Sequence, residues 1–183
     1  MTKRKTLSIV ALGAIASLLA VASFGAEAQS LAVANEESET RSLLLTAKAI
    51  GEALEDGENY VKVDGLKFSF SNAAYAEGKL TFAGGELYNE NLAGESKNAQ
   101  NRIGTGFKKV VFEGLENSAG FTVSFMSDKT TTLETIAMEA GGAATEAILS
   151  LTGNAKRVSM AFNSGTGVSF ASITYFYTCG NAS

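Results

Sequence analysis

Acidic side chains are the first candidates for chemistry in this chain, because none of its 183 residues is histidine. The commonest general base and the commonest zinc ligand are therefore missing. Three aspartates and one cysteine also leave few nucleophiles or metal ligands. A pair of glutamates could still hydrolyse a glycosidic bond, and the candidates are Glu86, Glu90, Glu95 and Glu113. Nothing in the sequence places two of them at the required separation, so solvated positions are favoured and we expect no enzymatic activity.

Tyrosine and asparagine side chains offer a second chemistry, because sugars need aromatic faces flanked by hydrogen-bonding groups. Tryptophan is absent, so the aromatic rings would come from tyrosines that flank a predicted hairpin. One of them leads into a polar, asparagine-rich stretch from Asn89 to Gly106, and loops of this length are often functional. The predicted ligand-binding residues are Tyr75, Tyr88, Asn89, Asn91, Asn98 and Asn101. The alternative is that both tyrosines are half-buried strand residues whose hydroxyls reach water.

Strands are the elements that must position these residues, because the chain alternates with period two from Asn59 onward. The turn pair Asp64-Gly65 separates two alternating runs and predicts a hairpin. A second hairpin is predicted in "GKLTFAGGELYN", with Gly84-Gly85 at its bend. Further strands are predicted at "FKKVVFE", "FTVSFMS" and "RVSMAFN", and at the end of the chain, with core faces formed by Phe121, Val123 and Phe125, by Val158, Met160 and Phe162, and by Ile173, Tyr175 and Tyr177.

Two segments allow both a helix and a strand. In residues 41–55, Leu44, Ala47, Ile50 and Leu54 form a helical stripe, but Ser42 to Thr46 could open as a strand; we expect a strand that leads into a helical turn. Residues 134–140 and 144–151 are good helix formers, yet Gly141-Gly142 interrupts them. Each half also alternates, through Ile136 and Met138 and through Ala147, Leu149 and Leu151. We therefore predict two strands there.

About nine short strands with regular turn signals predict an all-β fold, an antiparallel β-sandwich or jelly roll. The expected organisation is one β-sandwich domain over residues 41–183, preceded by a flexible spacer over residues 29–40. The spacer "QSLAVANEESET" has no periodicity and contains three glutamates.

The first 28 residues are expected to direct export. Lys3, Arg4 and Lys5 precede an apolar run from Leu7 to Phe24, and the small residues around Glu27 form a cleavage site of the kind signal peptidase accepts. The alternative is an uncleaved membrane anchor, since the run is just long enough to span a bilayer. Cleavage would place the protein in the extracellular space or the cell envelope, with no further membrane attachment.

The net charge argues against a nucleic-acid partner. Removing three basic residues and one acidic residue with the signal peptide changes the net charge from −4 to −6, which repels phosphates and anionic membranes. Cys179 has no partner cysteine within the chain. It is either a small apolar filler at a strand end or a disulfide to another chain, and we expect a monomer.

The order of these strands resembles the galactose-binding-like jelly-roll domains of secreted bacterial proteins. The resemblance is carried by "FKKVVFEG", then "FTVSFMSDKTTTLETIAM", and finally a closing strand "SFASITYFY", and it covers about Val61 to Cys179. Where the family often has a glycine and then a tryptophan after the aspartate, this chain has Lys129 and Leu133. A tryptophan platform for a sugar is therefore not implied.

The resemblance implies a binding module. Jelly rolls of this type often hold a structural calcium ion between loops, and the candidate ligands here are Glu116, Asn117 and Asp128; the alternative is ordinary polar turns. We expect a secreted, non-enzymatic binding or adhesion module for an extracellular glycan. The rival is a structural protein of the envelope or matrix that associates with copies of itself.

Overall fold

The structure, a computed structural model, describes residues 39–92, 106–165 and 167–179, all of which belong to one compact unit, Asn35–Ser183. The described residues form fourteen strands and one short helix. In chain order they are β1 (Glu39–Thr46), α1 (Ala47–Glu55), β2 (Tyr60–Val63), β3 (Leu66–Phe70), β4 (Ala73–Ala76), β5 (Lys79–Phe82), β6 (Glu86–Asn89), β7 (Gly106–Glu113), β8 (Glu116–Asn117), β9 (Phe121–Met126), β10 (Thr132–Met138), β11 (Glu146–Ile148), β12 (Arg157–Phe162), β13 (Val168–Phe170) and β14 (Ser172–Cys179). No helix in these ranges is long and apolar enough to cross a bilayer.

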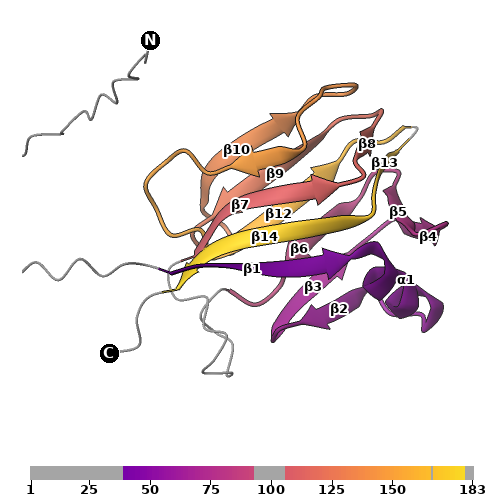
Figure 1. The fold of residues 1–183 in the computed structure, drawn as a ribbon, viewed down its shortest axis with the longest axis horizontal. Helices are drawn as coiled ribbons and strands as arrows, with labels where there is room; N and C mark the ends of the chain where they lie inside the picture. The colour runs from indigo at the N-terminus through magenta and orange to yellow at the C-terminus, as the bar shows by residue number, and fades with distance from the viewer. Residues whose placement is uncertain (1–38, 93–105, 166, 180–183) are drawn as a thin grey trace, which may run out of the picture. The chain divides into compact units, whose positions relative to one another are not determined.

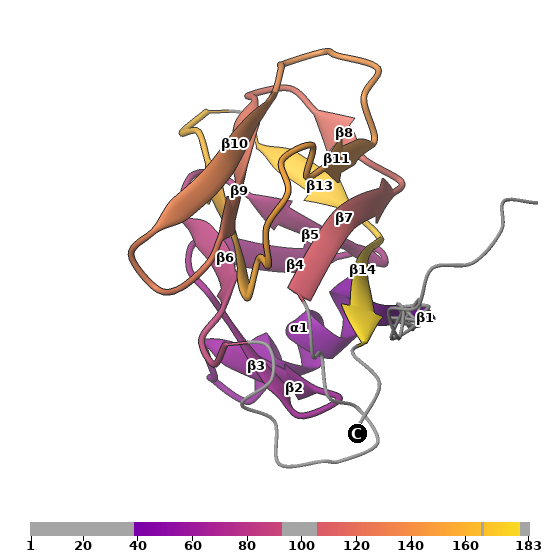
Figure 2. The ribbon, with the colours of Figure 1, turned by 90° about the vertical axis from the view of Figure 1, so that its left-hand side faces the viewer.

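The strands form three antiparallel sheets (Figure 1). The six-stranded sheet has the order β10-β9-β12-β6-β3-β2. The β14 sheet has the order β1-β14-β7-β11, and the small sheet has the order β4-β5-β13-β8. Figure 2 shows the two larger layers from the side, with β10, β9 and β6 in one and β7 and β14 in the other. Helix α1 packs against β4 and β5 of the small sheet.

An aromatic core joins the three sheets. The rings of Phe68 in β3 and Tyr175 in β14 lie 5.2 Å apart, which connects the six-stranded sheet to the β14 sheet. Phe82 of the small sheet stacks on Phe162 of β12 at 4.1 Å. Aromatic pairs at these distances stabilise a core beyond the area they bury. The fold is therefore an all-β antiparallel sandwich, as the alternation predicts.

The predicted core faces are confirmed in three central strands. In β9 the side chains of Phe121, Val123 and Phe125 are buried, while Thr122 and Ser124 between them are partly exposed. The predicted inward residues of β12 and β14 are buried in the same way. This leaves the intervening residues of each strand on the outer faces of the sandwich.

The first predicted hairpin is also confirmed. Strand β2 pairs with β3 in a register that sets Val63 opposite Leu66. Asp64 and Gly65 between them have φ angles of 48° and 82°. Two successive left-handed residues are what a tight turn between right-twisted strands requires, and aspartate followed by glycine adopts them at low cost.

The second predicted hairpin is wrong. Strand β5 pairs with β4 and β13, whereas β6 pairs with β3 and β12, so the Gly84-Gly85 turn passes the chain from one sheet to another. The hairpin in this region is instead β4–β5, which turns at Glu77 and Gly78, both with left-handed φ angles. A Cβ on Gly85 would lie 2.3 Å from the carbonyl oxygen of Ser71, so this glycine is needed for close backbone approach rather than for a hairpin.

Both ambiguous segments are resolved. Strand β1 leads into α1, as predicted, and the hydroxyl of Thr46 accepts a hydrogen bond from the Ala49 amide to cap the helix. Residues 134–151 contain strands, β10 and β11, and not helices. The predicted inward position of Leu151 is wrong, because this side chain is 55% exposed just beyond β11.

Candidate functional site

A row of hydroxyl side chains crosses the outer face of the six-stranded sheet. The pairing registers set one residue of each strand opposite the next, and every member of the row carries a hydroxyl group. From β2 to β10 the row is Tyr60, Ser69, Tyr88, Ser159, Ser124 and Thr135. The Ser124 and Thr135 hydroxyls lie 3.0 Å apart, within hydrogen-bonding distance. Ser69 is buried and its hydroxyl donates to Glu90, whereas the other five residues of the row are at least partly exposed and offer donors and acceptors on rigid backbone.

Charged side chains lie next to this row. The Nζ atom of Lys67 sits 4.3 Å from the ring centre of Tyr60, and the guanidinium carbon of Arg157 sits 4.3 Å from the ring centre of Tyr88. A cation over a tyrosine ring is attracted by the electrons of that ring. Lys62 lies directly opposite Lys67 on the edge strand β2. We call the hydroxyl row and these cations, together with Glu90, the polar face.

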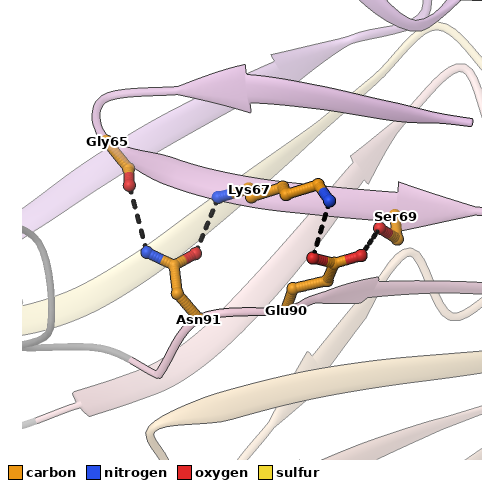
Figure 3. A network of polar contacts seen from close by, with 5 residues as sticks. All are labelled: Gly65, Lys67, Ser69, Glu90 and Asn91. Atoms are coloured by element: carbon orange, nitrogen blue, oxygen red, sulfur yellow. Dashed lines mark hydrogen bonds and ion pairs between the residues drawn. The ribbon is translucent and has the colours of Figure 1, made fainter. Parts of the chain in front are cut away.

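The carboxylate of Glu90 anchors the lysine side of the polar face (Figure 3). It lies 2.8 Å from the Nζ atom of Lys67 and accepts a hydrogen bond from the Ser69 hydroxyl. The hydrogen bond from Lys67, followed by that from Ser69, lowers the pKa of Glu90. The same hydrogen bond raises the pKa of Lys67. Both groups are therefore charged at neutral pH.

Asn91 fixes the β2–β3 hairpin to the segment that follows β6. Its side-chain oxygen accepts a hydrogen bond from the Lys67 amide at 2.7 Å, and its side-chain nitrogen donates to the Gly65 carbonyl at 3.1 Å (Figure 3). The side-chain amide of Asn91 thus continues the hydrogen bonding of β3 beyond the end of β6. Its main effect is to position Lys67.

Asn89 is buried and its amide group is engaged. The side-chain nitrogen donates to the carbonyls of Asn91 and Lys156, at 2.8 and 3.1 Å. The side-chain oxygen accepts from the Val158 amide at 2.7 Å. These bonds tie the end of β6 to the start of β12. They leave no donor hydrogen of Asn89 for a ligand.

The predicted ligand residues are divided between two places. Tyr88 and Asn91 lie on or beside the polar face, as described above. Tyr75 lies in the small sheet, where its ring packs so closely on α1 that a Cβ on Gly51 would come within 2.3 Å of it. Asn98 and Asn101 lie outside the described residues. The structure therefore brings together Tyr88 and Asn91 but not Tyr75.

The predicted calcium ligands are not brought together. Glu116 and Asn117 form β8, before the start of β9, while Asp128 follows its end, about 20 Å away at roughly 3.3 Å per strand residue. Glu116 pairs with Lys79, whose hydrogen bond lowers the pKa of Glu116. Within the described ranges, no group of three or more cysteine, aspartate or glutamate side chains could hold a metal ion.

Asn117 and Asp128 each complete a turn. The Asn117 side chain donates to the backbone carbonyls of Met138 and Glu139, at the end of β10, and accepts from the Gly120 amide at 2.8 Å. Asp128 accepts from the amides of Thr130 and Thr131, each at 2.8 Å. These bonds, led by the one from the Thr130 amide, lower the pKa of Asp128.

The glutamates considered for hydrolysis are also separated. Glu86 begins β6 and Glu90 follows its end, so the two lie about 13 Å apart along the outer face at roughly 3.3 Å per residue. Paired glycosidase carboxylates lie roughly 5 to 9.5 Å apart. Glu113 is in another sheet, at the end of β7, where it accepts a hydrogen bond from the Ser172 hydroxyl. Glu95 lies outside the described residues.

Sequence reasoning missed Tyr60, Lys67, Arg157 and Ser159 as members of the site. The alternation that predicted the core could have identified these residues, because they occupy the outward positions of the same strands. The stacking of Arg157 on Tyr88 had no such local signal, since 68 residues separate the two. Comparison with known proteins found no family model, no curated protein and no solved structure that matches the chain.

Proposed function

We propose that this chain is a secreted, non-enzymatic binding module that binds carbohydrate on its polar face. The observation that carries the proposal is the hydroxyl row, which includes two tyrosines and runs beside several cations. A sugar presents many hydroxyl groups at fixed spacing, and an array of donors and acceptors on rigid strands matches such a ligand with little ordering cost. The proposal includes export through the first 28 residues and action as a monomer.

The likeness to galactose-binding-like domains remains part of this proposal. It rests on the order and pattern of strands in the sequence, and fold-level analogy alone does not define a ligand. The polar face supports carbohydrate binding independently of that analogy, because its residues are named by register and contact. A sugar bound there would lie on the sheet surface.

A glycan array probed with the protein expressed from its full sequence tests the proposal. We expect binding to at least one glycan class, and we expect Tyr88→Ala to weaken it at least tenfold while the melting temperature changes little. Ile148→Ser, on the opposite side of the sandwich, is the control and should leave binding unchanged. An array without any bound glycan would overturn the proposal.

Self-association is a second candidate, favoured by the outer face of the β14 sheet. Leu44 in β1 is 52% exposed and Ile148 in β11 is 50% exposed. The registers place Val111 and Phe176 on the same face, between these two edge strands. We call these four residues, with the Lys109–Glu146 ion pair among them, the apolar face. An apolar surface that carries one charge of each sign is complementary to a copy of itself.

Analytical ultracentrifugation tests this candidate directly. If the apolar face joins two copies, the protein is a dimer and the double variant Leu44→Ser/Ile148→Ser is a monomer. Cys179 ends β14 opposite Glu39, and its side chain lies outside the described residues. A Cys179→Ser variant on a non-reducing gel separates a disulfide-linked dimer from one held by the apolar face.

A further inference from the structure

The polar face is basic although the chain as a whole is acidic. Lys62, Lys67 and Arg157 all lie on it, together with Glu90 and, on the same outward side of β6, the exposed Glu86. Lys129, in the β9–β10 turn, is near enough for its charge to help lower the pKa of Glu90. The net charge of the chain is −4. Three cations thus accompany two carboxylates on this surface of a chain that is acidic overall, and this excess of positive charge favours an anionic ligand.

Arg157 lacks a counter-ion in the described chain. Lys67 is paired with Glu90 at 2.8 Å. Arg157 forms no ion pair with any described residue, and its Nε atom is buried without a hydrogen-bond partner there. Its guanidinium group is instead held against the Tyr88 ring. Arginine has five donor hydrogens in a fixed plane that matches a carboxylate, so this side chain is oriented but not neutralised.

The cations over the tyrosine rings also favour an anionic ligand. A neutral sugar that stacks on an aromatic ring needs a free ring face. On the polar face each ring already carries a cation, Lys67 over Tyr60 and Arg157 over Tyr88. A neutral sugar would gain nothing from these cations, whereas an acidic sugar can use the cation as its partner.

We propose that the ligand of the polar face is an acidic polysaccharide, and that Arg157 binds the carboxylate of one of its uronate units. The inference rests on the proposed carbohydrate-binding function and specifies its ligand class. The partly exposed hydroxyls of Ser159 and Ser124, which follow Tyr88 in the hydroxyl row, bind hydroxyl groups of the same chain. Lys62, Lys67 and Lys129 attract the neighbouring carboxylates.

The test compares polygalacturonate with its fully methyl-esterified form, which has the same sugar backbone but no free carboxylate. Binding of the protein, expressed from its full sequence, is measured by isothermal titration calorimetry. We expect binding to polygalacturonate and at least tenfold weaker binding to the ester. Arg157→Met should reduce the affinity for polygalacturonate at least tenfold, and Arg157→Lys should restore part of it, because lysine keeps the charge but not the planar group.

Lys48→Met is the matched control, since it also removes one positive charge but belongs to α1 and not to the polar face. It should leave the affinity unchanged, and the melting temperatures of all variants should show that they fold. Equal binding of the acid and the ester, or an Arg157→Met variant that binds as well as the parent, overturns the inference while carbohydrate binding stands. Binding to polyglutamate but not to polygalacturonate also overturns it. A failure of both acidic and neutral glycans to bind removes the carbohydrate-binding function itself.

Discussion

The two outer faces of the sandwich differ in chemistry although both cover the same core. The polar face exposes hydroxyls and cations that are fixed by contacts with one another, such as the Lys67–Glu90 pair. The apolar face exposes Leu44 and Ile148, each about half accessible to solvent. The inward residues of both sheets are buried and largely aromatic or aliphatic. Burial in the core therefore explains the residue types on the inward side of these strands. The residues on the outward side are free to serve a ligand or a partner.

The comparison also separates polar residues that build the sheet from polar residues that are available at its surface. Asn89 is buried and bonded on three sides. Arg157 lies two residues from Ser159 on β12 and has no charged partner in the described chain. Both are polar and lie close together in the fold. Their hydrogen bonds, and not their residue types, indicate which one can meet a ligand.

The largest effect is expected for the core beneath the polar face. Phe125→Ala removes a fully buried ring from β9 and should lower the free energy of unfolding by about 3 to 5 kcal/mol, as measured by urea denaturation. Thr122→Ala, on the outward side of the same strand, should cost less than about 1 kcal/mol. Similar losses of stability for the two variants would show that the outward residues of β9 also stabilise the fold.

A smaller loss is expected for Asn89→Ala. The substitution leaves the buried Val158 amide and the partly buried Lys156 carbonyl without their side-chain partner. Unpaired buried groups cost about 1 to 3 kcal/mol each, so urea denaturation should show a total loss of about 2 to 4 kcal/mol. If Asn89→Ala instead keeps its stability and loses only glycan binding, Asn89 belongs to the site and not to the sheet.

Local pattern made the strands and their core faces predictable. Phe121, Val123 and Phe125 share a face because neighbouring side chains in a strand point in opposite directions, which needs no knowledge of the partner strand. The Asp64-Gly65 hairpin was predictable for a similar reason, since a two-residue turn brings its own flanking strands together.

Long-range pairing was not predictable from the same pattern. Gly84 and Gly85 resemble a hairpin turn, but the partner of β6 is β12, about 70 residues further along the chain. The candidate site depends on this pairing, because it brings Arg157 to Tyr88 and the Lys156 and Val158 backbone to Asn89. The sequence could therefore indicate Tyr88 as an aromatic candidate but not the cation that covers it.

A modest gain in stability is expected under the apolar face. The Tyr175 hydroxyl is fully buried in β14 and has no hydrogen-bond partner in the described chain. Tyr175→Phe removes this unpaired group and should raise the free energy of unfolding by about 1 kcal/mol.

Burial also raises the pKa of Tyr175, so the folded state favours the neutral phenol. The protonated phenol therefore contributes to the stability of the folded state at pH values below its unfolded pKa of about 10. This contribution is lost as the pH rises above that value.

Urea denaturation at pH 8 and pH 10.5 distinguishes the two states of the phenol. The parent protein should lose more stability between these pH values than Tyr175→Phe, which has no group to ionise at this position. A Tyr175→Phe variant that is less stable than the parent at pH 8 would indicate a partner for the hydroxyl.

The smallest effect is expected for Glu90→Gln on the polar face. The Lys67–Glu90 pair is about one-third exposed, and exposed ion pairs contribute little to stability. The melting temperature at pH 7 should therefore fall by no more than about 2 °C.

The effect of Glu90→Gln should also depend on pH. Because the pKa of Glu90 is lowered in the folded state, the contribution of Glu90 to stability is present above its unfolded pKa of about 4.5 and is lost as the pH falls below that value. The difference in stability between the parent and the variant should therefore shrink as the pH falls below about 4.5. The same substitution removes the acidic side chain beside Lys67, so the affinity for polygalacturonate should rise about two- to threefold, by analogy with a single weak surface charge interaction. An affinity that falls instead would mean that Glu90 supports binding, by holding Lys67 in place or by accepting hydrogen bonds from the ligand, and does not repel the carboxylates.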